Sequence, residues 1–165
     1  MNARIKDTDH GFAALKMRMA KLAAGARLTV GIHEAEGDQP AEGDDSGATL
    51  GEVAAYNEFG GPNNNPPRRS FLADWADENQ DQNQDLFRRS VKAVALGKLP
   101  SVDVALDRLG LRFVGDIQQR MAGGIAPENR PSTIARKGSS TPLIAGGQLR
   151  GALSYQVTNG TKGDQ

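Results

Sequence analysis

The chain has 165 residues, and its 20 Lys and Arg residues balance its 20 Asp and Glu residues. A neutral chain has no global attraction to nucleic acid or to an anionic membrane, although a local basic patch stays open. The absence of Cys excludes disulfides, thiolate zinc sites and cysteine nucleophiles, and only two His exclude a multi-histidine metal site. No apolar run approaches the roughly 20 residues that span a bilayer, and the N-terminus lacks the apolar core of a signal peptide. We therefore expect one domain over residues 1–165, made in a cytoplasm and without membrane contact.

The first part of the chain predicts a helix followed by a strand. The apolar residues of the segment 9–24 recur every three or four positions and share one helical face, with Asp9 as the expected cap. These apolar residues are Phe12, Leu15, Met19 and Leu22. Beyond Gly25, apolar and polar residues alternate through Leu28–His33, which predicts a half-buried strand.

Residues 34–48 predict a loop, because nothing apolar larger than Ala occurs in it. Its carboxylates are Glu34, Glu36, Asp38, Glu42, Asp44 and Asp45. Clustered carboxylates can bind a hard cation such as calcium. The segment lacks the ordered spacing of an EF-hand loop, so we interpret it as a solvated, mobile loop.

Two helices are expected next. Thr49, with Glu52 three residues later, predicts a capping box for a helix from Leu50 to Phe59. Gly60 is expected to end it in a left-handed conformation. Residues 71–96 predict a second, long helix whose middle, from Asp77 to Asp85, is nine polar residues in a row. A helix that is polar all round lies in solvent or bridges partners.

The clearest helix is Ser101–Met121, with Ser101 as its cap. Its apolar positions are spaced three or four apart: Val102, Leu106, Leu109, Phe113, Ile117 and Met121. Residues 123–147 then predict a second long loop, with a short helical turn at 132–137. A brief helix over 147–153, a strand over 153–157 and a flexible tail over 159–165 complete the chain.

Three patterns could carry chemistry. The segments Gly138–Thr141 and Gly146–Gly147 resemble phosphate-binding loops, but neither fits the Walker pattern. Carboxylate pairs such as Glu58 with Asp74, or Asp74 with Asp77, would suit a small hydrolase, yet any charged chain offers such pairs. Two basic segments could bind phosphates or acidic partners, or pair within the chain. They are Arg68-Arg69 and the group Arg130, Arg136 and Lys137.

Two sequence blocks resemble a known family. The first is Tyr56-Asn57-Glu58-Phe59-Gly60 followed by Pro66-Pro67-Arg68-Arg69-Ser70-Phe71-Leu72. The second runs from Asn129 through Thr133-Ile134, Lys137-Gly138 and Pro142-Leu143-Ile144 to Gly147, Leu149-Arg150 and Ser154-Tyr155. In order and spacing they resemble the tail-completion, or head–tail joining, proteins of tailed bacteriophages, over about residues 10 to 158.

The resemblance implies a small, non-enzymatic α+β protein at the neck or tail end of a virion, assembled in the bacterial host cytoplasm. It implies a ring-like homo-oligomer that contacts the tail-terminator, tail-tube and head-connector proteins, with contact to packaged DNA left open. It implies no cofactor and no metal. Ser70 stands where a proline is common in the family, which predicts a looser turn.

The expected contact residues come from both blocks. They are Tyr56, Glu58, Phe59, Arg68, Arg69, Arg130, Arg136, Lys137, Leu143, Leu149 and Arg150. We expect Glu58 to pair with Arg68 or Arg69 and so to hold the linker against the helix. We also expect the Pro142–Ile144 wedge, with Leu149, to dock onto the 54–59 helix, within one subunit or between neighbours.

The sequence thus predicts an α+β fold, with a small antiparallel sheet packed against two or three helices and with long loops. The helices expected on the sheet are those at 102–121 and 9–24. Two alternative functions stay open. One is a nucleic-acid-binding module that uses the basic segment 130–137, and the other is a small carboxylate hydrolase, which needs a carboxyl with a raised pKa in a concave pocket.

Overall fold

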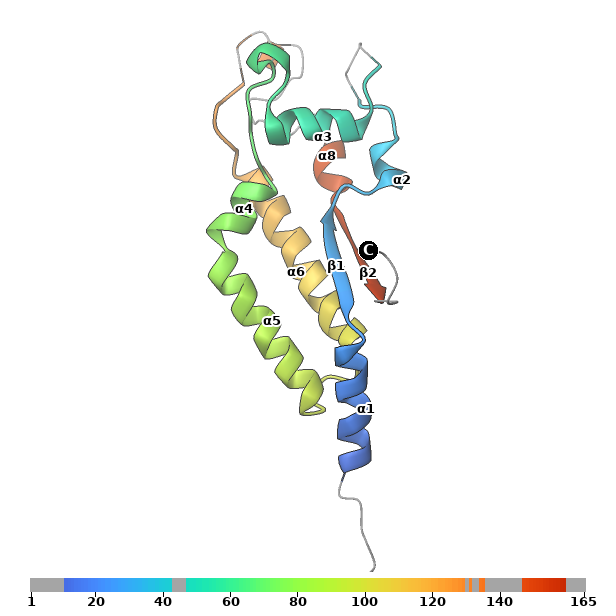
Figure 1. The fold of residues 1–165 in the computed structure, drawn as a ribbon. Coiled ribbons are helices and arrows are strands. Elements are labelled where there is room, and N and C mark those ends of the chain that lie inside the picture. The colour runs from blue at the N-terminus through green and yellow to red at the C-terminus, as the bar shows by residue number, and fades with distance from the viewer. Residues whose placement is uncertain (1–10, 43–46, 130, 132–133, 136–146, 160–165) are drawn as a thin grey trace, which may run out of the picture.

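A computed structural model describes residues 11–42, 47–129, 131, 134–135 and 147–159 of the chain. The described part has the expected α+β fold, in which a two-stranded antiparallel sheet packs one face against helices (Figure 1). The central element is α6 (Val102–Ala122), which lies between α5 (Gln80–Ala95) and the sheet. The predicted cap Asp9, the 159–165 tail beyond Asn159 and most of the 132–137 turn lie outside the described residues.

Helix α6 forms because its apolar residues recur on one face. Seven residues of the helix are buried: Ala105, Leu106, Leu109, Gly110, Phe113, Ile117 and Met121. Ser101 caps the helix as predicted, since its hydroxyl accepts a hydrogen bond of 3.2 Å from the amide of Val104. Removing each large apolar side chain from water is worth about 1.5–3 kcal/mol, so this face forms the main part of the core.

The sheet pairs β1 (Ala26–Gly31) with β2 (Ser154–Asn159), which come from opposite ends of the chain. Leu28 lies opposite Val157, and Val30 lies opposite Tyr155, on the face that packs against α6. Arg27 and its neighbours on the other face are exposed, in agreement with the predicted alternation. The sheet therefore packs one face against α6 and leaves the other open.

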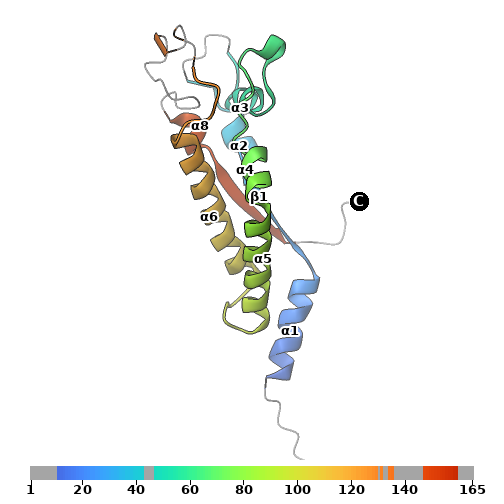
Figure 2. The same ribbon diagram turned by 90° about the vertical axis from the view of Figure 1, so that its left-hand side faces the viewer.

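The remaining helices gather at one end of the molecule. These are α2 (Glu34–Gly37), α3 (Leu50–Phe59), the short 3-10 helix η1 (Pro62–Asn64), α4 (Ala73–Glu78) and α8 (Gln148–Gly151). Helix α1 (Phe12–Ala23) lies at the opposite end of the elongated molecule (Figures 1 and 2). The two ends are joined by β1, which leads from α1 to α2.

Helix α1 differs from its prediction in position and in packing. It begins at Phe12, after Gly11, and none of its residues is buried. It packs beside α5 and not on the sheet, where α6 is the helix in contact with both strands. The apolar spacing correctly predicted a helix, but spacing does not identify the surface that covers an apolar face.

Two further predictions need correction. The segment 34–48 is not a plain loop, because it contains α2 and a bridge that pairs Pro40 with Thr49. The long helix expected over 71–96 is divided at Asn79 into α4 and α5. The backbone of Asn79 leaves the helical conformation, with φ −108° and ψ 13°, and its side chain donates a 2.8 Å hydrogen bond to the carbonyl of Trp75.

Two glycines of α6 give a matched test of this packing. A Cβ at Gly110 would overlap the ring of Tyr155, whereas a Cβ at Gly115 would enter open space. We predict that Gly110→Ala lowers the free energy of unfolding by about 1–3 kcal/mol, because the strand must move away from the helix. Gly115→Ala should raise it by about 0.5–1 kcal/mol through helix propensity. Urea unfolding of both variants measures these changes, and equal effects would contradict the packing of β2 on α6.

Candidate functional site

The end of α3 holds a buried carboxylate that binds the segment leading into α4. Glu58 is only 6% exposed. Its Oε1 accepts hydrogen bonds from the Ser70 hydroxyl at 2.6 Å and from the Ala73 amide at 2.9 Å. Its Oε2 accepts from the amides of Phe71 and Leu72, at 2.9 and 3.1 Å. One side chain of the first resembling block thus binds three donors from the end of the same block and a fourth from Ala73, the first residue of α4.

These donors need a partner because the first amides of a helix have none within it. A carboxylate at this position also suits the positive end of the helix dipole. Ser70 completes the arrangement, since its hydroxyl accepts a 3.0 Å hydrogen bond from the amide of Asp74 while donating to Glu58. Ser70 is 1% exposed, and its two hydrogen bonds fix the start of α4. That the turn is looser than one with a proline stays a prediction.

The network determines the ionisation of Glu58. Burial alone would raise the pKa of this carboxyl, but the hydrogen bonds from Ser70 and the three amides outweigh it and hold the pKa below its usual value of 4.5. The hydrogen bond from Arg68 likewise lowers the pKa of Asp74. The hydrolase alternative needs a carboxyl with a raised pKa, and these two members of its proposed pairs have lowered ones.

The two arginines make different contacts from those expected. Arg68 pairs with Asp74 at 2.6 Å. Arg69 is buried and donates from Nε to the carbonyl of Pro127 at 2.7 Å and from Nη2 to that of Glu128 at 3.2 Å. Their predicted pairing with Glu58 is therefore wrong. Its expected consequence, a segment held against α3, is met through Ser70 and backbone amides, and Arg69 adds the loop at 127–128 to the same cluster.

Two aromatic side chains lie on the outer side of α3. Its inner side carries Asn57 and Glu58, which are 8% and 6% exposed. Tyr56 is 41% and Phe59 is 76% exposed. Gly60 then ends the helix with the positive φ expected of this glycine, 89°, while its ψ of 138° lies outside the left-handed helical region. Phe59 is thus an exposed aromatic residue at a backbone position that the Glu58 network fixes.

The second resembling block is described only in part. Arg130, Arg136, Lys137 and Leu143 lie outside the described residues, as does the Pro142–Ile144 wedge. Leu149 on α8 is 6% exposed and belongs to the same core cluster as Leu50 and Ala54 of α3. Leu149 therefore packs within the chain.

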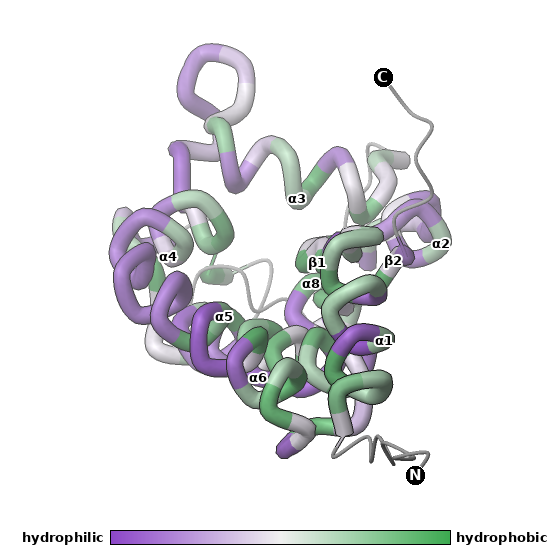
Figure 3. Tube along the Cα trace, turned by 60° about the horizontal axis from the view of Figure 1, so that its bottom comes forward, coloured by the Kyte–Doolittle hydropathy of each residue, from purple (hydrophilic) through white to green (hydrophobic). Residues whose placement is uncertain are grey.

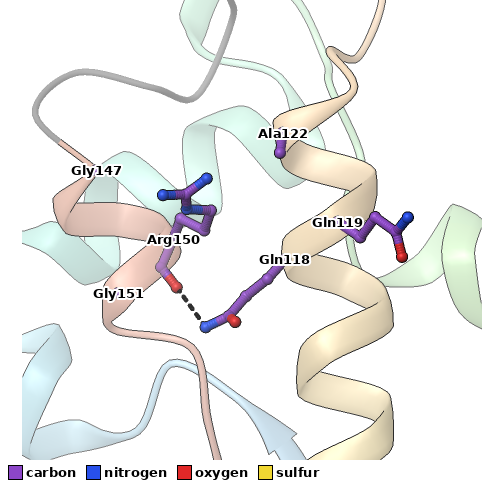
Figure 4. Close-up of a pocket in the computed structure, with 6 residues that line it drawn as sticks. All are labelled: Gln118, Gln119, Ala122, Gly147, Arg150 and Gly151. Carbon is purple, nitrogen blue, oxygen red and sulfur yellow. Dashed lines mark hydrogen bonds between the residues drawn. The ribbon is translucent and has the colours of Figure 1, made fainter.

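Arg150 lies beside an open depression between α8 and the end of α6 (Figure 4). The depression has a volume of about 410 Å³. Its lining residues are Gln118, Gln119, Ala122, Gly147, Arg150 and Gly151. The Gln118 side chain donates a 3.0 Å hydrogen bond to the carbonyl of Arg150, which joins the two helices. The guanidinium of Arg150 is one of the groups beside this opening.

Sequence reasoning missed Ser70 and Asn57. Ser70 stands three residues before the first residue of α4, where the N-cap position is Leu72, so cap spacing does not identify it. Asn57 donates to the carbonyl of Val53 at 2.7 Å, and its own carbonyl accepts from the Arg69 amide at 2.6 Å. No sequence signal predicts this second contact, because it depends on the path of the chain after Gly60.

Within the described ranges, no group of three or more His, Asp or Glu residues is placed to hold a metal ion. The same part of the chain contains no helix long and apolar enough to cross a bilayer. Comparison of the chain with models of protein families, with curated proteins and with solved structures finds no match. The resemblance to tail-completion proteins therefore rests on the residues of the two blocks alone.

The Glu58 network makes a prediction about acid stability. Because the folded-state pKa of Glu58 lies below its usual value of 4.5, the stabilisation is complete above about pH 4.5 and is lost as the pH falls through the folded-state pKa. Glu58→Gln should cost about 2–4 kcal/mol at pH 7, because it removes a charged acceptor from buried donors. The cost should shrink as the pH falls from 7 to 3, as measured by urea unfolding of both proteins.

Glu128→Gln is the matched control, since Glu128 is exposed and its side chain undergoes the same chemical change. It should change the free energy of unfolding by less than about 0.5 kcal/mol at either pH. A Glu58→Gln variant as stable as this control at pH 7 would show that the carboxylate does not hold the segment.

Proposed function

We propose that the protein is a non-enzymatic structural component of a tailed-bacteriophage virion that completes the tail or joins the tail to the head at the neck. In this role it contacts the tail-terminator, tail-tube and head-connector proteins, as a ring-like homo-oligomer around the path of the packaged DNA. The proposal rests on the two sequence blocks and on the Glu58 network, which joins the two parts of the first block.

The main observation in favour of the proposal is the way in which Glu58, the buried carboxylate of the network, is bound. Glu58 has all its hydrogen bonds to the chain's own donors, and its pKa is lowered. A carboxylate saturated in this way is suited to holding two segments together and poorly suited to proton transfer. The residues that give the resemblance therefore act as a scaffold, which favours a protein that works by contact.

The scaffold also presents a surface for contact. Phe59 is 76% exposed although it belongs to the resembling block, and Tyr56 lies one turn before it. Exposed aromatic side chains on a rigid backbone commonly supply much of the energy of a protein interface. Leu149, by contrast, is used inside the chain, so Phe59 and Tyr56 are the described candidates for a partner contact.

The test is binding to purified tail tubes of the phage that encodes the chain, followed by co-sedimentation and by light scattering. We predict that the protein saturates at a small fixed number of copies per tube, because only the tube ends offer a site. Phe59→Ser should weaken this binding roughly tenfold or more while leaving unfolding unchanged. Leu111→Ser is the matched control, because Leu111 is 64% exposed on the outer side of α6.

Binding along the whole tube, or none at all, would contradict the proposal. So would a protein that retards DNA with a steep dependence on salt and ignores tubes, which is the result expected of the nucleic-acid-binding alternative. Equal losses of tube binding in the two Ser variants would show that Phe59 is not the contact.

A further inference from the structure

Helix α1 contributes no residue to the hydrophobic core of the described chain. It has 12 residues, and none of them is buried. Its one substantial contact with another helix or strand of the described chain is with α5. Isolated helices of this length are marginal in water, because most helical stability comes from packing of an apolar face. Leu15, Met17 and Met19 are nevertheless 40%, 65% and 50% exposed. The helix therefore presents apolar area that the rest of the described chain does not cover.

The charges of α1 limit what could cover it. It contains Lys16, Arg18 and Lys21 and no acidic residue. Lys16 and Lys21 are exposed, and no described carboxylate lies within ion-pair distance of them. Two copies of α1 packed against each other would bring like charges together, which is unfavourable. The covering surface should therefore be acidic.

An acidic surface lies at the opposite end of the same molecule. The segment 34–42, which we call the acidic surface, carries four carboxylates and no Lys or Arg: Glu34, Glu36, Asp38 and Glu42. None of the four is in an ion pair with a described cation. The acidic stretch around α4 is partly neutralised, since Asp74 pairs with Arg68 and Glu78 with Arg120, while Asp77 has no ion pair with a described cation. Ala35 and Pro40 are exposed between the carboxylates and offer apolar contact.

The two surfaces cannot meet within one molecule. Both ribbon views place α1 at one end and α2 at the other, with β1 between them (Figures 1 and 2). Seen from the α1 end, α1 shows mostly apolar positions, whereas α4 and α5 are mostly hydrophilic (Figure 3). A contact between α1 and the acidic surface must therefore join two molecules, and it joins different surfaces of each. A contact of this kind, if its rotation closes, generates a ring.

We propose that α1 of one copy docks on the acidic surface, residues 34–42, of the next copy, head to tail. The inference rests on the proposed function only in that a ring is the form a neck protein takes. The interface is small: a 12-residue helix is about 18 Å long and covers less than the roughly 800 Å² per partner of a standard interface. Association is therefore weak between two copies, and it weakens further as salt screens the charges.

The experiment is a charge exchange followed by light scattering. We would measure the mass of the full chain from about 10 µM to about 1 mM, the range that fits a small interface, at low and high salt. The wild-type mass should rise with concentration to a fixed limit. Lys16→Glu with Lys21→Glu should weaken association roughly tenfold or more, and Glu34→Lys with Asp38→Lys should do the same. All four changes in one chain should restore it.

The matched control reverses two exposed cations elsewhere, Arg88→Glu with Arg108→Glu, and should leave the mass unchanged. Circular dichroism checks that each variant folds. Should a reversal variant unfold, Lys16→Gln with Lys21→Gln removes the same charges and should also weaken association. Restoration by the fourfold exchange is the result that a merely destabilised helix cannot give.

Several results would overturn the inference. A wild-type monomer at about 1 mM and low salt would do so, as would reversals that leave the mass unchanged. If the fourfold exchange did not restore association, the apolar face of α1 would be covered by a surface other than residues 34–42. Binding of the wild-type chain to vesicles of anionic phospholipid, lost on Lys16→Glu with Lys21→Glu and without self-association, would identify that surface as a membrane.

The test is separate from that of the proposed function. Charge-dependent association without tube binding would leave this interface standing and reject the neck role. Tube binding by a chain that stays monomeric under all conditions would reject the interface and leave the neck role standing.

Discussion

The arrangement of the α3 end of the molecule depends on one buried carboxylate. Glu58 accepts four hydrogen bonds from the segment that follows the Pro66-Pro67 turn, and three of them come from backbone amides at the start of α4. Without the carboxylate these amides would lose their acceptor, at a cost of about 1–3 kcal/mol for a buried amide such as that of Phe71. The carboxylate thus fixes where α4 begins, and through α4 it fixes Trp75 against Phe113 of α6, with ring centroids 5.3 Å apart.

The two ends of the molecule differ because only one of them is built on the core. At the α3 end, Leu50, Ala54 and Leu149 join the cluster that includes Phe113, Ile117 and Met121. At the other end, α1 extends past the sheet, and none of its residues is buried. Exposed groups near the core end, such as Phe59, have fixed positions, whereas α1 gains its full packing only from a second surface. A structural protein can use exposed groups such as Phe59 to bind a partner and α1 to bind its own copies.

The sequence predicted those features that local rules determine. The Thr49–Glu52 capping box, the apolar face of α6 and the alternation of β1 all depend on residues within one or two turns, and all are confirmed. The break at Asn79, the exposure of α1 and the partners of Glu58 depend on the path of distant segments, which no local pattern contains. Opposite charge predicted that Glu58 would pair with Arg68 or Arg69. The unpaired amides at the start of a helix also bind a carboxylate well, and they do so without removing a second charge from water.

Amide hydrogen exchange tests the role of Glu58 most directly, because it reports on the donors themselves. The amides of Phe71, Leu72 and Ala73 should exchange slowly in the wild-type protein at pH 7. In Glu58→Gln they should exchange at least roughly tenfold faster, while amides in the middle of α6, such as that of Leu109, change much less. This pattern would show that the carboxylate holds the start of α4. Fast exchange of the three amides in the wild-type protein, or a uniform change across α6 and α4 in the variant, would contradict the account.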